Sequence, residues 1–203
     1  MKSRVEILRK KSLAEHIPVM RPRTSELLAK IAQDVQPSQV LEIGTCIGLG
    51  AITLLLSGAE KVTTIEIDEE RYFQAKKNIK EFGLTERCEC ILGDCKSIIP
   101  LMENNRYDLI VLDGPKTFYK DFLPYMKNML NDGGVVFVDD VDFYGLTEGE
   151  ELPQRKHRTN VLAIRDFVRT VKSDKEFLCE EYKIEDGVMV LFYRGKGAEN
   201  QLS

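Results

Sequence analysis

Residues 40–51 read VLEIGTCIGLGA, and this stretch decides the fold. It begins with apolar residues that suit a buried strand, breaks at Gly44 and regains helical character from Ala51. A strand that ends in glycine and turns into a helix directs backbone N–H groups and a positive helix terminus into a crevice. We therefore expect residues 40–51 to form a cofactor-binding turn.

The next expected strand ends in an acidic residue. Residues 62–66 read VTTIE, and Glu66 follows the turn by roughly twenty residues, where a carboxylate can accept hydrogen bonds from ribose hydroxyls. The glycines Gly44, Gly48 and Gly50 give G-x-x-x-G-x-G, whereas a pyrophosphate-binding turn needs G-x-G-x-x-G. No P-loop motif is present either. The spacing favours a nucleoside cofactor without a pyrophosphate.

Strands alternate with helices along most of the chain, which predicts a parallel sheet covered on both faces. Near the end, Asp186-Gly187 is a two-residue hairpin signal between two short apolar runs, which predicts antiparallel strands at the sheet edge. The expected strands are 40–43, 62–66, 88–92, 107–113, 135–138, 181–184 and 188–193. The expected helices are 2–15, 24–35 with Thr24 as N-cap, 51–56, 69–82, 96–104 with an early interruption at Pro100, 118–130 and 161–171, with a turn at 131–134.

The bulk composition indicates one α/β domain spanning 1–203, with 1–35 as a basic helical extension, a long polar loop at 142–158 and a flexible tail at 195–203. Residues 1–30 carry eight Lys or Arg against three Glu, which leaves a net −9 on the rest of a chain of net charge −4. No apolar run reaches the roughly 20 residues of a membrane span, and the first residues lack a signal-peptide core, so we expect a cytoplasmic protein. The odd number of cysteines, without Cys-x-x-Cys spacing, predicts free thiols.

Acidic residues follow the expected strands with unusual regularity. Because ligands bind beyond the carboxyl ends of parallel strands, these side chains face the expected crevice. Asp94-Cys95 lies beside Glu66 and can touch an adenine edge, while Glu42 is an acid inside the first strand. Carboxylates that converge repel one another unless a divalent cation lies between them, and oxygen ligands without histidine favour Mg²⁺, Ca²⁺ or Mn²⁺. The converging set is Asp113, Asp139 and Asp140, with Lys116 within reach.

Five ordered motifs carry a resemblance that covers the chain from about His16 to Arg194. They are VLEIGTCIGLGA at 40–51, TTIEID at 63–68, ILGDC at 91–95, YDLIVLDGPK at 107–116 and GGVVFVDDVDFYG at 133–145. Together they resemble the S-adenosylmethionine-dependent O-methyltransferases of the catechol and caffeoyl-CoA type. The resemblance implies a Rossmann-like methyltransferase fold with a mostly parallel, seven-stranded sheet, an antiparallel C-terminal hairpin and helices on both faces.

The resemblance also implies roles for matching positions. The methionine part of the cofactor would be lined by Glu42, Gly44, Thr45 and Gly48. Glu66 would hold the ribose, and Asp94 with Cys95 would flank the adenine. The metal ligands would be Asp113, Asp139 and Asp140, although the family usually has Asn where this chain has Asp140. Asp113 would also contact the cofactor and take part in catalysis. Lys116 matches the catalytic lysine and could accept or relay a proton if its surroundings lower its pKa.

The acceptor stays open between a small hydroxylated aromatic and a tRNA. The run Arg155-Lys156-His157-Arg158 is either a solvated helix start or, together with the basic first 30 residues, a phosphate contact. This run and the segment 16–20 resemble bacterial members that methylate 5-hydroxyuridine at the tRNA wobble position. Tyr119 and Tyr144 are either acceptor-pocket residues or ordinary half-buried aromatics. Relatives commonly form homodimers, and we expect no membrane partner. Two remote alternatives are a nicotinamide-dependent oxidoreductase and a non-catalytic nucleoside- or RNA-binding module.

Overall fold

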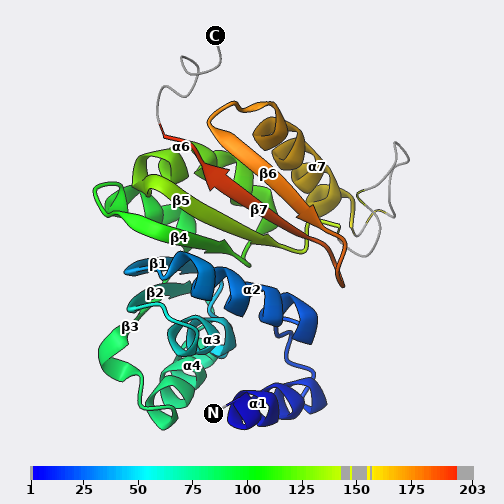
Figure 1. The fold of residues 1–203 in the computed structure, drawn as a ribbon. Coiled ribbons are helices and arrows are strands. Elements are labelled where there is room, and N and C mark those ends of the chain that lie inside the picture. The colour runs from blue at the N-terminus through cyan, green and yellow to red at the C-terminus, as the bar shows by residue number, and fades with distance from the viewer. Residues whose placement is uncertain (1, 143–146, 148–154, 156, 196–203) are drawn as a thin grey trace.

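Seven strands form one sheet in the computed structural model, which describes residues 2–142, 147, 155 and 157–195 (Figure 1). In spatial order they are β3 (Cys88–Leu92), β2 (Lys61–Glu66), β1 (Gln39–Ile43), β4 (Tyr107–Leu112), β5 (Leu130–Asp139), β7 (Val188–Tyr193) and β6 (Phe177–Tyr182). The strands β1 to β5 pair in parallel, while β7 pairs antiparallel with β5 and β6. The predicted mostly parallel sheet with an antiparallel C-terminal hairpin is confirmed.

Helices cover both faces of this sheet. One face carries α2 (Pro22–Val35), α3 (Leu49–Leu56) and α4 (Glu69–Glu81). The other carries α5 (Cys95–Ile98), α6 (Tyr119–Met129) and α7 (Arg158–Ser173). The basic helix α1 (Lys2–Ala14) lies outside these layers and contacts α3, as Figure 1 shows. Three short 3₁₀ helices complete the set: η1 (Thr85–Arg87), η2 (Ile99–Met102) and η3 (Lys116–Phe118).

The central strands are apolar on both sides because each side faces a layer of helices. In β4, Ile110 and Leu112 belong to the core beneath α5 to α7, whereas Leu109 and Val111 belong to the core beneath α2 to α4. All four side chains are fully buried. This double burial explains why the strand reads as a continuous apolar run rather than as an alternating one. None of the described helices is long and apolar enough to span a membrane.

Several predicted boundaries are wrong, for local reasons. The hairpin strand β6 ends at Tyr182, and the connection to β7 occupies 183–187 rather than two residues, with Glu185 and Gly187 at φ 49° and 77°. The predicted interruption of helix 96–104 near Pro100 is confirmed, because Pro100 lacks the N–H that a continuous helix needs. The segment divides into α5 and η2 and ends at Met102, two residues before the predicted end. The predicted turn at 131–134 is instead the first part of β5.

The start of α2 also differs from the prediction. Thr24 is not the N-cap; the helix begins with Pro22 after Arg21, whose side chain makes no capping hydrogen bond. The backbone amides of Arg23 and Thr24 instead donate to the carboxylate of Glu185, which lies at the tip of the β6–β7 hairpin. The cap therefore comes from a residue 161 positions away, and no local sequence signal marks it.

The described part of the chain does not include every residue named from the sequence. Tyr144, Lys156, most of the loop 142–158 and the tail from residue 196 onward lie outside it. All five cysteines are free, as their count and spacing predicted.

The core beneath α2 to α4 can be tested at Phe137, which is fully buried in β5. We expect Phe137→Ala to lower the free energy of unfolding by about 3–5 kcal/mol, because the cavity loses packing as well as apolar burial. The matched control is Leu101→Ala in η2, where the side chain is 84% exposed and the change should stay within about 0.5 kcal/mol. Denaturant unfolding of both variants measures the difference; equal losses would contradict the assigned core.

Candidate active site

The turn after β1 requires glycine at two places where backbone or side chains approach closely. Gly44 has φ 99°, and a Cβ there would lie 2.2 Å from the carbonyl oxygen of Asp113 at the end of β4. A Cβ at Gly50 would lie 2.0 Å from Glu42 Oε1. Gly48 has φ 83° and packs against Ala75 of α4. The turn therefore lies against the end of β4 on one side and against the buried acid Glu42 on the other.

That buried acid, Glu42, supports the turn through two threonines. Thr64 Oγ1 donates to Glu42 Oε2 at 2.6 Å, and the hydroxyls of Thr64 and Thr45 lie 2.6 Å apart. Burial raises the pKa of Glu42 to about 8, against the opposing effect of the Thr64 hydrogen bond. Glu42 is therefore mainly uncharged at neutral pH, which is the less costly form for a side chain that is 1% exposed.

A cleft of about 450 Å³, the cofactor cleft, opens in front of the turn. Glu66 lies in its wall, 7% exposed, and its carboxylate accepts from the amides of Cys46 at 2.7 Å and of Ile67 and Asp68 at 2.9 Å. Asp94 also lines it and caps α5 by accepting from the Lys96 amide at 2.9 Å. The amide bonds fix Glu66 at the end of β2, beside the turn.

Most residues predicted for the cofactor meet at this place. The cofactor cleft contains Gly44, Glu66, Asp94, Cys95 and Asp113 from the predicted set. Glu42 and Thr45 lie in a narrow crevice next to it, beneath the turn, whereas Gly48 lines neither space. Sequence reasoning missed Pro18, Ile67 and Arg71, which also line the cofactor cleft. Ile67 follows Glu66 directly and is 69% exposed, so an apolar residue after the strand-end acid was the available signal.

A second cleft, of about 270 Å³, adjoins the first, and we call it the carboxylate cleft. It contains Asp113, Asp139 and Asp140, together with Glu185 and Asp186 of the hairpin tip. Asp113 also lines the cofactor cleft and therefore stands at the junction. The structure thus brings the three predicted metal-ligating residues to one edge of the sheet.

Lys116 sits among these carboxylates. Its ammonium lies 3.1 Å from Asp140 Oδ2 and 3.8 Å from Asp113 Oδ1. It also donates to the hydroxyl of Tyr119 at 3.1 Å and lies 3.4 Å from the Asp139 carbonyl oxygen. Tyr119 is 2% exposed and accepts from the Gly114 amide at 3.1 Å, so it is a buried partner of Lys116 rather than a half-buried surface aromatic.

Burial and mutual repulsion raise the pKa values of two carboxyls in this cluster. For Asp139 burial acts first and the charges of Asp113 and Asp140 add to it; for Asp113 burial again dominates, opposed by Lys116. Burial lowers the pKa of Lys116, but the negative groups around it outweigh this and raise that pKa above its ordinary value. The negative groups around Lys116 therefore favour its charged ammonium form, and its predicted role in proton transfer stays a prediction.

The donor set fits a divalent cation in chemistry and charge. Three carboxylates face one lysine, and repulsion among them adds to burial in raising the pKa values of Asp113 and Asp139. Their oxygens are hard ligands of the kind that Mg²⁺ prefers. Within the described ranges, however, no three acidic, thiol or imidazole groups converge closely enough to hold a metal. A cation would have to displace the ammonium of Lys116 from Asp140.

Comparison with known proteins agrees with the geometry. Residues 2–194 match the sequence profile of a family described as O-methyltransferase. The chain belongs to the O-methyltransferase family. The catechol O-methyltransferase of Bos taurus is 25% identical over 190 residues, which span 85% of this chain and 62% of that protein. The catechol O-methyltransferase of Niastella koreensis is 26% identical over 151 residues, or 72% of this chain and 66% of that one.

Solved structures show the same fold. The O-methyltransferase from Bacillus cereus, in complex with SAH, superposes with a TM-score of 0.81 at 21% identity, covering 94% of this chain and 90% of that chain. The family and the fold that the five motifs implied are therefore confirmed. The two remote alternatives, a nicotinamide-dependent oxidoreductase and a non-catalytic binding module, give way to an O-methyltransferase.

The buried acid beneath the turn makes a pH prediction. Because Glu42 keeps its proton in the folded state up to about pH 8, while the unfolded chain releases it near 4.5, its contribution to stability falls as pH rises between these values. We expect Glu42→Gln to remove this part of the pH dependence. Between pH 5 and pH 8, the free energy of unfolding of wild type should therefore fall by several kcal/mol relative to that of the variant. Unfolding in denaturant at both pH values measures this double difference. Glu89→Gln, at an exposed site on β3, is the control, and a variant that keeps the wild-type slope would contradict the assignment.

Proposed function

We propose that this O-methyltransferase uses S-adenosylmethionine, assisted by a divalent cation, to methylate a hydroxyl of a small hydroxylated aromatic or similar acceptor. The observation that carries the proposal is the junction of the two clefts at Asp113. One cleft has a glycine turn and a strand-end acid suited to a nucleoside. The other is lined by Asp113, Asp139 and Asp140, and the first and last of these lie beside the buried Lys116. A methyl group held at the end of the first cleft faces the second.

The reaction is an in-line displacement at the sulfonium methyl. A bond forms between the acceptor oxygen and the methyl carbon, the sulfur–methyl bond breaks, and S-adenosylhomocysteine leaves as a neutral thioether. The acceptor proton passes to solvent. Positioning two reactants at close range supplies much of the rate enhancement, because the sulfonium is already activated.

The residues of the carboxylate cleft would serve the acceptor oxygen. The charged Lys116, fixed by Tyr119 and Asp140, is placed to stabilise negative charge that develops on that oxygen. Asp113, Asp139 and Asp140 would hold the cation. When bound, a divalent cation lowers the pKa of a hydroxyl and fixes its direction. Glu66 and Asp94 would hold the nucleoside end of the cofactor in the adjoining cleft.

The experiment is transfer of a labelled methyl group from S-adenosylmethionine to catechol, with and without Mg²⁺ and EDTA. We expect turnover with Mg²⁺, none with EDTA, and a loss of at least about a hundredfold in Asp113→Ala and Asp139→Ala, because the cation supplies several kcal/mol of stabilisation. Asp121→Ala, exposed in the first turn of α6, is the matched control. Intact turnover in both site variants would refute the cation-assisted mechanism.

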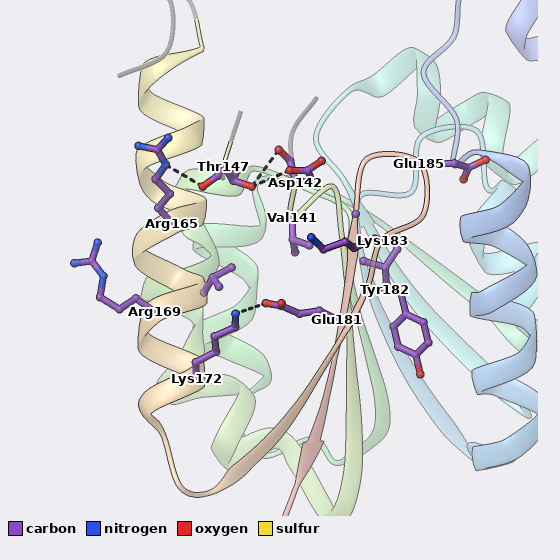
Figure 2. Close-up of a pocket in the computed structure, with 13 residues that line it drawn as sticks. Val141, Asp142, Thr147, Arg165, Arg169, Lys172, Glu181, Tyr182, Lys183 and Glu185 are labelled. Atoms are coloured by element: carbon purple, nitrogen blue, oxygen red, sulfur yellow. Dashed lines mark hydrogen bonds and ion pairs between the residues drawn. The ribbon is translucent and has the colours of Figure 1, made fainter. Parts of the chain in front are cut away.

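A second acceptor class, a tRNA 5-hydroxyuridine, is favoured by one specific feature. A cleft of about 650 Å³ lies between α7 and the β6–β7 hairpin and is bordered by Arg165, Arg169, Lys172 and Lys183 (Figure 2). Lys172 pairs with Glu181, but Arg169 has no carboxylate within ion-pair distance in the described part of the chain. Cations beside the carboxylate cleft suit the phosphates of a polyanionic acceptor. Of the basic run at 155–158, Arg155, His157 and Arg158 are described and precede or begin α7.

This alternative is tested with bulk hydroxyuridine-containing tRNA as acceptor. If tRNA is methylated, we expect Arg169→Glu to lower transfer to tRNA by roughly tenfold, since a reversed charge repels phosphate, while transfer to catechol stays unchanged. Arg106→Glu, exposed at the opposite ends of the strands, is the matched control. If both variants lower methyl transfer to tRNA equally, the cleft between α7 and the β6–β7 hairpin is not part of the acceptor site.

The expected homodimer stays a prediction.

A further inference from the structure

The segment between α1 and α2 forms a wall shared by both clefts. Pro18 lines the cofactor cleft, the narrow crevice under the turn and the carboxylate cleft. Val19 and Met20 line the crevice and the carboxylate cleft. A cofactor in the first space would be bounded by Pro18, and an acceptor in the second by Pro18, Val19 and Met20, so the position of this wall affects both.

Two contacts hold the wall from one side. The thiol of Cys46, in the glycine turn, donates to the Pro18 carbonyl at 3.1 Å. The guanidinium of Arg9, in α1, donates to the Met20 carbonyl and is 3% exposed. The wall is therefore tied at one end to the cofactor turn and at the other to the N-terminal helix.

The hairpin tip holds the wall from the other side, where it continues into α2. Glu185 Oε2 accepts from the Thr24 amide and from the Thr24 hydroxyl, both at 2.8 Å, and Oε1 accepts from the Arg23 amide at 3.1 Å. Asp186 pairs with Arg21 at 2.6 Å. Figure 2 shows Glu185 directed from the hairpin toward the first turn of α2.

Local capping could not replace these contacts. The first amides of a helix have no partner within the helix, Pro22 has no N–H, and the side chain of Arg21 makes no capping hydrogen bond. The carboxylate of Glu185 therefore satisfies two orphan amides and meets the positive end of the helix at once. These hydrogen bonds hold the pKa of Glu185 below its ordinary value, although partial burial opposes them.

We propose that Glu185 and Asp186 form a clamp that positions residues 18–20 as the common wall of the two clefts. The two acids lie outside the cofactor cleft, yet they set how tightly it closes. They are positioning residues for the methyl transfer and do not touch the cofactor. This inference rests on the proposed function, because it takes the two clefts to be the cofactor and acceptor sites.

The test uses Glu185→Gln, which keeps the size of the side chain and removes its charge. We expect the Kd for S-adenosylhomocysteine, measured by calorimetry, to rise about tenfold, and trypsin to cleave after Arg23 at least several times faster. The melting temperature without cofactor should change by no more than about 2 °C, since capping changes are small against the whole domain. Glu181→Gln, on the same hairpin and exposed, is the matched control and should match wild type in all three measurements.

A charge reversal gives a second arm in case Glu185→Gln fails to fold. Arg21→Glu alone should weaken S-adenosylhomocysteine binding and speed cleavage after Arg23, and adding Asp186→Arg should restore both. A Kd and a cleavage rate in Glu185→Gln equal to those of wild type would overturn the clamp, as would a reversed pair no better than Arg21→Glu. If wild type does not bind S-adenosylhomocysteine, the proposed function fails, whereas cleavage after Arg23 still reports on the clamp.

Discussion

The close approach of the turn after β1 to the end of β4 is the constraint on which the site depends. Only glycine fits at position 44, because any Cβ would overlap the Asp113 carbonyl. That contact puts the cofactor turn next to the strand that carries Asp113 and Lys116. The parallel register β2–β1–β4–β5 then brings Glu66 to one side and Asp139 with Asp140 to the other. The two clefts adjoin because neighbouring parallel strands end at the same edge.

The acidic residues at this edge of the sheet fall into two groups, one uncharged and one partly charged. Glu42 is buried beneath the turn and stays protonated at neutral pH, so it supports the loop as a hydrogen-bonding group rather than as a charge. The cluster around Lys116 contains more acidic than basic groups, and their mutual repulsion adds to burial, the main cause of the raised pKa values of Asp113 and Asp139. A cationic species, either a metal ion or the sulfonium of the cofactor, would be attracted to such a place. The excess of acidic groups therefore suits both the divalent cation and the sulfonium cofactor of the proposed reaction.

The sequence sufficed for the features that depend on local pattern. Buried apolar runs predicted the parallel strands, and the glycines predicted the turn after β1. The acids Glu66, Asp94 and Asp113 could be assigned to the site because they follow strands, and parallel topology brings the ends of those strands to one edge. It failed where a distant residue decides the outcome. Glu185 caps α2 across 161 positions, so Thr24 looked like a local cap. Pro18 enters the site because the link between α1 and α2 lies against the distant glycine turn, where the Cys46 thiol donates to its carbonyl. The pKa of Lys116 depends on burial, which lowers it, and on the groups around it, which raise it, and spacing alone shows neither effect.

The most direct measurement of the central claim is a calorimetric titration of the purified protein with S-adenosylmethionine and, in parallel, with NAD. The glycine spacing and the position of Glu66 predict saturable binding of S-adenosylmethionine, weak or no binding of NAD, and loss of binding in Gly44→Val, whose side chain would fill the space against Asp113. Tighter binding of NAD, or unchanged S-adenosylmethionine binding in Gly44→Val, would contradict the account.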